Sequence, residues 1–134
     1  MDDEIPLTGG NVAAGVTRVG DTIRKPVTAN TPATQALLTK LAAAGVNGVP
    51  QFLGIDDNNR QMLRFVSGDT DFPTNLWTED TALLSAARLL RRIHNATLSL
   101  TDATVPWAYS HPDPLQHEVI CHNDFAPYNM TFDT

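Results

Sequence analysis

The chain has 134 residues, 42% of them hydrophobic and 18% charged, and a formal net charge of -6. This composition indicates a globular chain with one modest core and argues against a disordered one. Binding to nucleic acid is not expected, because phosphate contacts need clustered Lys and Arg. The only basic clusters are the pairs at 24–25 and 91–92, which are too small to form a patch.

The first residues and the single cysteine bear on the location of the protein. The sequence Met1-Asp2-Asp3-Glu4 lacks the basic and apolar regions of a signal peptide. No apolar run approaches the length of a transmembrane helix. Cys121 has no second cysteine to pair with, so no internal disulfide can form. The sequence therefore predicts a cytoplasmic protein without a membrane contact.

Short strands and one helix are predicted for the first part of the chain. Residues 16–19 alternate apolar and polar side chains, 20–21 supply a turn, and a second strand from residue 22 ends at Pro26, which has no N–H to donate. Thr31 is then a suitable N-cap, Pro32 a first helical residue and Gly45 a stop. The predicted apolar face of this helix consists of Ala33, Ala36, Leu37, Leu41 and Ala44.

Two further strands are predicted over residues 51–55 and 61–66, with a turn at 56–59 between them. The polar stretch 67–71 then indicates a hinge or linker. We therefore divide the chain into a strand-rich section, residues 1–67, and a second section, residues 68–134.

The second section begins with a strong helix signal. Thr78 is the expected N-cap, acidic residues fill the first turn, and the helix should run to about His94. Its apolar stripe has helical spacing. A loop and a short apolar strand over 118–121 follow. The whole pattern predicts an α+β fold. The stripe consists of Leu83, Ala86, Ala87, Leu90 and Ile93.

The residues after that strand form a His-x-Asp-x-x-x-x-Asn pattern at His122, Asp124 and Asn129. Phosphoryl transfer depends on positioning and on charge stabilisation. An Asp can accept or orient the proton of an attacking hydroxyl, and an Asn oxygen can bind Mg²⁺ without adding charge. A preceding His can brace the loop by hydrogen bonds. Asp and Asn also occur in turns that only bond the local backbone, which is the competing interpretation.

Two other chemistries are disfavoured. Zinc binding by His111, His117, His122 and Asp124 matches no common ligand spacing. A nucleophile–base pair of Cys121 and His122 is unfavourable because neighbours on a strand point to opposite faces. Cys121 is therefore expected to be a small buried hydrophobic residue.

The loop at 122–129, with the apolar strand before it and Met130-Thr131-Phe132 after it, resembles the catalytic loop of the aminoglycoside phosphotransferase and choline kinase superfamily. The end of the second helix resembles the helix that precedes this loop in the family. Residues 9–12, 16–19 and 22–26 resemble the family's first three strands, and residues 48–54 fit the strand after its first helix.

This resemblance implies a protein-kinase-like N-lobe, an antiparallel sheet plus one helix, joined to a truncated helical C-lobe. It implies a kinase that transfers phosphate from ATP or GTP, with Mg²⁺, to a hydroxyl of an aminoglycoside-like small molecule. Asp124 would be the catalytic base, His122 would support it, and Asn129 would hold the metal.

The resemblance also implies nucleotide contacts. Either Arg24 or Lys25 would bind phosphate, and strand alternation allows only one of them to face the nucleotide. Gly9 and Gly10 would belong to a loose glycine loop. Phe65 and Val66 would form the hinge that meets adenine. The first helix has no acidic residue to pair with the cation, and Gln35 is the nearest polar candidate.

The family's second metal-binding Asp, on a strand beyond the loop, has no counterpart before Thr134. The alternative hypothesis is therefore an inactive kinase-like fragment or pseudokinase that binds nucleotide or a partner without transfer. The apolar face of the second helix would then be exposed and would favour self-association.

Overall fold

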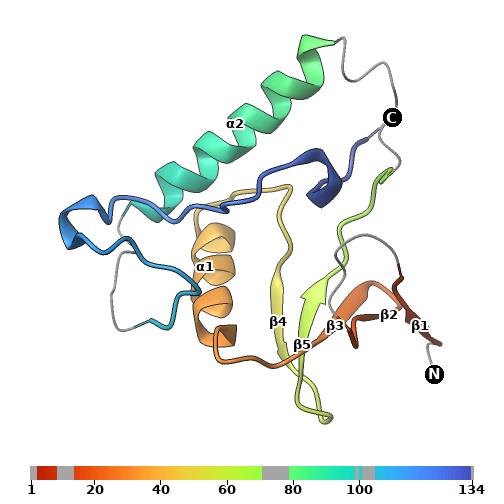
Figure 1. Cartoon of the computed structure of the whole chain (residues 1–134). Helices are drawn as coiled ribbons and strands as arrows, with labels where there is room; N and C mark the ends of the chain where they lie inside the picture. The colour runs from red at the N-terminus through yellow and green to blue at the C-terminus, as the bar shows by residue number, and fades with distance from the viewer. Residues whose placement is uncertain (1–2, 9–13, 71–78, 99, 101–104, 134) are drawn as a thin grey trace.

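The computed structural model describes residues 3–8, 14–70, 79–98, 100 and 105–133. It is an α+β arrangement with one five-stranded antiparallel sheet and two helices (Figure 1). The spatial order of the strands is β1-β2-β3-β5-β4. Their bounds are Glu4–Pro6 for β1, Thr17–Val19 for β2, Thr22–Pro26 for β3, Phe52–Ile55 for β4 and Arg60–Arg64 for β5.

The turns predicted between the strands are confirmed. Gly20, with a φ of 56°, lies in the turn between β2 and β3. Between β4 and β5, the Asp56 carboxylate accepts hydrogen bonds from the backbone N–H groups of Asn58 and Arg60, at 3.1 and 2.8 Å. This is the local bonding that makes Asp a turn former. Asn59 supplies the left-handed residue of the turn, with a φ of 58°.

Helix α1, Thr31–Ala43, lies where the sequence predicts it, but its N-cap is Asn30 instead of Thr31. Thr31 is the first helical residue, and its hydroxyl accepts a hydrogen bond from the Thr28 backbone. Gly45 ends the helix as predicted, with a φ of 70° and its N–H bonded to Ala42. The inward face differs from the prediction: Leu38 is buried and Ala44 is exposed.

Helix α2, Asp80–Thr97, is longer at its C-terminal end than predicted, and its N-cap is Glu79 instead of the expected Thr78, which lies outside the described residues. Ile93 is 8% exposed and joins the core, but Leu83, which the sequence placed on the same stripe, is 69% exposed. The core therefore draws on α1, β5 and the C-terminal half of α2. Its buried members are Leu38, Leu41, Val46, Leu63 and Ile93.

The predicted strand at 118–121 does not form. Ile120 donates its backbone N–H to the Thr97 hydroxyl at 3.1 Å, instead of to a neighbouring strand. The segment after α2 instead contains two short 3₁₀ helices, Pro114–Gln116 and Pro127–Asn129.

Asp69 and Phe132 form an isolated antiparallel bridge between the segment after β5 and the last described residues. Their backbones exchange two hydrogen bonds, at 2.8 and 3.0 Å, and the Thr131 hydroxyl donates to the Ser67 carbonyl. This contact brings the end of the loop segment beside the chain that leaves β5, as Figure 1 shows near the C-terminus.

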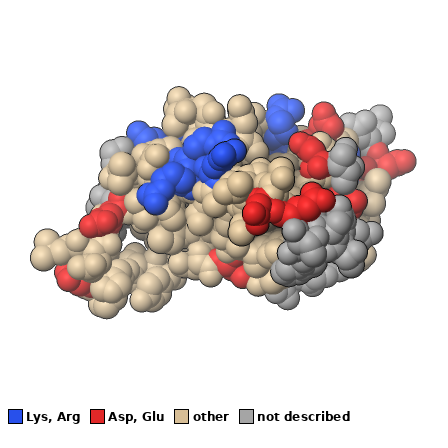
Figure 2. All heavy atoms as spheres, turned by 90° about the horizontal axis from the view of Figure 1, so that it is seen from above, with Lys and Arg blue, Asp and Glu red and all other residues tan. Residues whose placement is uncertain are grey.

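The outer surface of α2 carries the three arginines that the sequence assigned to a solvated face. Arg88, Arg91 and Arg92 are all exposed. Figure 2 looks down on the side that carries α2, where Lys and Arg gather in the middle and acidic residues lie mainly towards one end. Among the described residues, no helix has the length and apolarity needed to cross a membrane.

We expect Gly68 to be the most sensitive glycine near the Asp69–Phe132 bridge. Its φ is 140°, and a Cβ there would lie 2.8 Å from Thr131. Gly45 also has a positive φ, but its Cβ would meet nothing within 4 Å. Urea unfolding should therefore show that Gly68→Ala costs about 2–4 kcal/mol and Gly45→Ala about 1 kcal/mol. Equal costs would show that the contact of Gly68 with Thr131 contributes nothing.

Candidate functional site

The predicted loop brings Asp124 and Asn129 together. The Asn129 amide nitrogen donates to the Asp124 carboxylate at 3.0 Å and to the Asp124 backbone carbonyl at 2.9 Å. The other carboxylate oxygen accepts a hydrogen bond from the Tyr128 hydroxyl at 2.5 Å. Both oxygens of the carboxylate are thus held by residues of the same loop, while all three side chains stay exposed.

The orientation of the Asn129 amide matters for metal binding. Its nitrogen faces Asp124 through two hydrogen bonds, so its oxygen Oδ1 points away from that carbonyl. Mg²⁺ takes oxygen ligands. Asn129 Oδ1 is a side-chain oxygen of this type that points away from Asp124, whereas both carboxylate oxygens of Asp124 accept hydrogen bonds within the loop. The described residues contain no group of three or more His, Cys, Asp or Glu that could hold a metal. A metal ion at this loop would take its remaining ligands from phosphate or water.

Phe125 anchors the loop to the core. It is half-buried and packs against the core cluster, whereas its neighbour Asp124 is exposed. His122 meets the Phe125 ring edge-on, with a centroid separation of 5.8 Å. The His122 Nδ1 atom also accepts the Asp124 backbone N–H at 3.3 Å. His122 therefore contacts both the anchor and the residue that carries the carboxylate.

Asn123 allows the chain to change direction between His122 and Asp124. It has a φ of 65°, in the left-handed region, where Asn is tolerated better than most residues. Its conformation lets Phe125 point towards the core while Asp124 remains at the surface.

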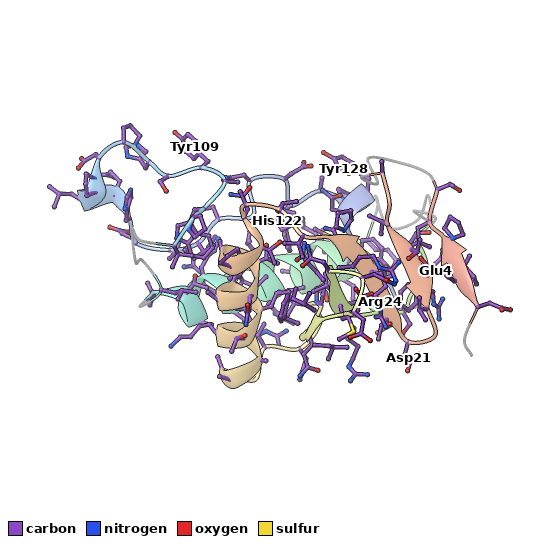
Figure 3. The ribbon with its side chains drawn as sticks, turned by 90° about the horizontal axis from the view of Figure 1, so that it is seen from below. Glu4, Asp21, Arg24, Tyr109, His122 and Tyr128 are labelled. Atoms are coloured by element: carbon purple, nitrogen blue, oxygen red, sulfur yellow. The ribbon has the colours of Figure 1, made fainter. Side chains whose placement is uncertain are left out.

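The outer face of the sheet, opposite to the core, holds an ionic network. Arg24 lies 3.3 Å from the Asp56 carboxylate and donates to the Thr22 hydroxyl. Arg60 bonds to Asp56 at 3.0 Å and to Glu4 at 2.5 Å. In Figure 3, Arg24 and Glu4 lie on the sheet, and His122 and Tyr128 lie along the loop. Arg24 is therefore already paired with a carboxylate on the face away from the core.

Lys25 lies on the inner face of the sheet, the face that carries Ile23 and Leu63. In the β3–β5 register, Ile23 is opposite Leu63 and Lys25 is opposite Gln61. Residues directly opposite in an antiparallel pair share a face. Leu63 is in the core and Gln61 is 5% exposed, so this face is the packed one.

A second cation, Arg18, shares the inner face with Lys25. Arg18 pairs with Ile23 in the β2–β3 register, and its guanidinium lies 3.8 Å from the centre of the Phe65 ring. The Phe65 backbone N–H donates to the Asp21 carbonyl at 2.8 Å, and Val66 follows beyond the end of β5. Gly9 and Gly10 lie outside the described residues.

Several features were not predicted from the sequence. Cys121 was expected to be buried and is exposed, because no strand forms at 118–121 to turn it inward. Tyr128, Phe125 and Arg18 had no predicted role. The spacing of Tyr128 within the loop gives no signal of its contact with Asp124, which depends on the turn at Pro127–Asn129.

Comparison with known proteins gives no match: no protein-family model, no curated protein and no solved structure matches the chain.

The bond between Tyr128 and Asp124 should be visible in the ionisation of the phenol. The hydrogen bond to the carboxylate, burial and the negative charge of Asp124 raise the pKa of Tyr128 above its usual value of 10.0. In a Tyr109→Phe background Tyr128 is the sole tyrosine, because the chain has two. An absorbance titration of the phenolate should then show a lower pKa after Asp124→Asn. Asp113→Asn, in the same loop segment, is the control, and an unchanged pKa in the Asp124 variant would contradict the contact.

The outer network should make stability depend on acid pH. Hydrogen bonds from Arg60 and Thr17 lower the pKa of Glu4 below 4.5. Burial raises the pKa of Asp56, but bonds from Arg60 and Asn58 outweigh burial and leave it below 3.8. Because both pKa values are depressed in the folded state, the stabilisation is present above the unfolded values and is lost as the pH falls through the folded ones.

Urea unfolding at a series of pH values should show this loss below about pH 4.5. Arg60→Met should reduce the pH dependence. Arg64→Met is the matched control on the same strand, because Arg64 bonds to Gln51 and forms no ion pair with a carboxylate in the described part of the chain. A pH dependence that is equal in the two variants would show that the Arg60 network does not contribute.

Proposed function

We propose that this chain carries the catalytic loop of a phosphotransferase, which moves a phosphoryl group from ATP or GTP to a hydroxyl of a small molecule with the help of Mg²⁺. The observation that carries the proposal is the Asp124 carboxylate, held on both oxygens by Tyr128 and Asn129. A fixed carboxylate at the surface of a loop anchored in the core can orient a hydroxyl for attack.

Tyr128 indicates how the acceptor would bind. Its hydroxyl donates to Asp124 Oδ1, which is the bond that an attacking alcohol would make with its base. Tyr128 is 68% exposed, so its contact can exchange with a ligand at little cost. An acceptor hydroxyl would share or take over this position. Asp124 would receive its proton as the acceptor oxygen bonds to the γ-phosphorus and the bond from that phosphorus to the ADP or GDP leaving group breaks.

Asn129 would hold the metal ion, and Asp124 would be left to act on the acceptor hydroxyl. The Asn129 bond to the Asp124 backbone carbonyl fixes the amide so that Oδ1 can face a cation. When bound, Mg²⁺ would neutralise charge on the phosphate oxygens. The loop fits an ion that arrives with its nucleotide, because it offers the amide oxygen of Asn129 and leaves the other positions to phosphate and water.

The inner face of the sheet supports nucleotide binding. Lys25 and Arg18 both lie on it, and the catalytic loop packs against the same core through Phe125. Lys25 is therefore a better phosphate ligand than Arg24, which is paired with Asp56 on the other face. The Phe65 N–H is bonded to Asp21, so adenine would form its hydrogen bonds with the Phe65 carbonyl or the Val66 backbone.

The order of the elements also supports the proposal. Three strands, α1 and two strands in one antiparallel sheet are what the family resemblance implies for an N-lobe. The alternative is a protein that binds nucleotide or a partner without transfer. The Tyr128 hydroxyl on Asp124 favours this alternative if the contact persists when nucleotide is bound, since the base would remain occupied.

The test is phosphoryl transfer from Mg·ATP or Mg·GTP to a panel of alcohols, with nucleotide affinity measured separately. Asp124→Ala should reduce kcat by about 10²–10⁴-fold and leave nucleotide affinity within about threefold, because a positioning base acts in the transition state. Asp57→Ala, at an exposed turn residue, is the control. Equal loss of turnover and affinity would give Asp124 a structural role, and nucleotide binding without any transfer would establish the alternative.

A further inference from the structure

A cavity of about 480 Å³ lies between the first half of α1 and the loop that precedes Asp124. This volume is within the range of small-molecule sites. One wall ends at His122 and Asn123, the two residues directly before Asp124. In the view of Figure 3, His122 lies between Tyr109, which also lines the cavity, and Tyr128. The cavity therefore adjoins the loop that carries the proposed base.

The walls of the cavity are tied to both helices. The Asn30 amide, at the start of α1, donates to the Pro106 carbonyl at 2.8 Å. The far wall is held to α2 by the bond from the Ile120 N–H to the Thr97 hydroxyl. Side chains from α1 that are three or four residues apart form the floor of the cavity, because that spacing places them on one helix face. These are Asn30, Ala33, Thr34 and Leu37.

The lining combines aromatic and imidazole rings with amide and hydroxyl side chains. Among its described residues there is no Asp, Glu, Lys or Arg. An aminoglycoside carries several ammonium groups, and burying them without carboxylates is costly. A flat neutral compound could instead stack on the rings and use the imidazole and amide groups for its hydroxyl. The ring-bearing side chains of the lining are Trp107, Tyr109, His111, His117 and His122.

We infer that this cavity binds neutral aromatic compounds that bear a hydroxyl. Resting on the proposed function, these compounds are the acceptor class of the phosphotransfer reaction. This replaces the polycationic acceptor that the family resemblance implies with a neutral one.

The experiment compares 2-naphthol, a neutral probe, with kanamycin, a polycationic one, by calorimetric titration into the full chain. Thr34→Glu places a carboxylate in the cavity, whereas Gln35→Glu adds the same charge to the next residue of α1, which is exposed and does not line the cavity. Thr34→Glu should weaken 2-naphthol binding by about tenfold or more, because a carboxylate resists desolvation. Gln35→Glu should change it less than about twofold.

Absence of 2-naphthol binding, equal effects of the two variants, or tighter binding of kanamycin than of 2-naphthol by the unmodified chain would overturn the inference. Transfer of phosphate to kanamycin but not to 2-naphthol would overturn it as well. Mg·nucleotide affinity of the unmodified chain and of Asn129→Ala, measured alongside, tests the proposed function separately. Nucleotide binding that depends on Asn129, without 2-naphthol binding, would rule out the inferred acceptor class and leave the proposed function standing. Binding of 2-naphthol without Asn129-dependent nucleotide binding would rule out the proposed phosphotransferase function and still support the inferred ligand class of the cavity.

Discussion

The packing of Phe125 against the core determines where the candidate site lies. The loop has little regular structure of its own, and its polar side chains are exposed. Phe125 contacts the cluster formed by α1, β5 and α2, and full burial of such a ring is worth about 1.5–3 kcal/mol. Because Asp124 is the preceding residue, the position of this ring fixes the position of the carboxylate. The exposed hydrogen bonds of Tyr128 and Asn129 then need only orient it.

The same cluster joins the two sections of the chain. Leu41 comes from α1, Leu63 from β5 and Ile93 from α2, so residues on both sides of the predicted linker share one core. The Asp69–Phe132 contact reinforces this arrangement close to the end of the described chain. A substitution in the core-facing side of α1 or β5 would therefore shift the loop through packing. Among the described residues, neither element forms a hydrogen bond with Asp124.

The sequence was most informative where structure depends on local chemistry. The Asp56 turn, Gly45 at the end of α1 and the strand alternation around Ile23 all follow from a few neighbouring residues. The sequence was least informative where the local structure depends on a hydrogen-bond partner that is distant in the chain. Residues 118–121 are apolar enough for a strand, but Ile120 finds a helix hydroxyl instead of a sheet edge. The Asp124–Asn129 spacing indicated a candidate site, whereas the contact with Tyr128 required the turn geometry of the loop.

Strand parity also explains why residue type alone could not choose between Arg24 and Lys25 as the proposed phosphate ligand. Arg24 and Lys25 are adjacent cations, and the planar guanidinium of an Arg can bind a phosphate through two parallel hydrogen bonds. The register places Arg24 opposite Met62 and Lys25 opposite Gln61, so the two cations occupy different faces of β3. Asp56 already compensates Arg24, and recruiting Arg24 to a phosphate would leave a carboxylate with one fewer partner. The ion pairs of the described residues involve Arg24 and Arg60. Lys25 forms none with a carboxylate in this part of the chain. A phosphate on the inner face would therefore gain a partner in Lys25 without disrupting the network that holds β1, β3 and the β4–β5 turn together.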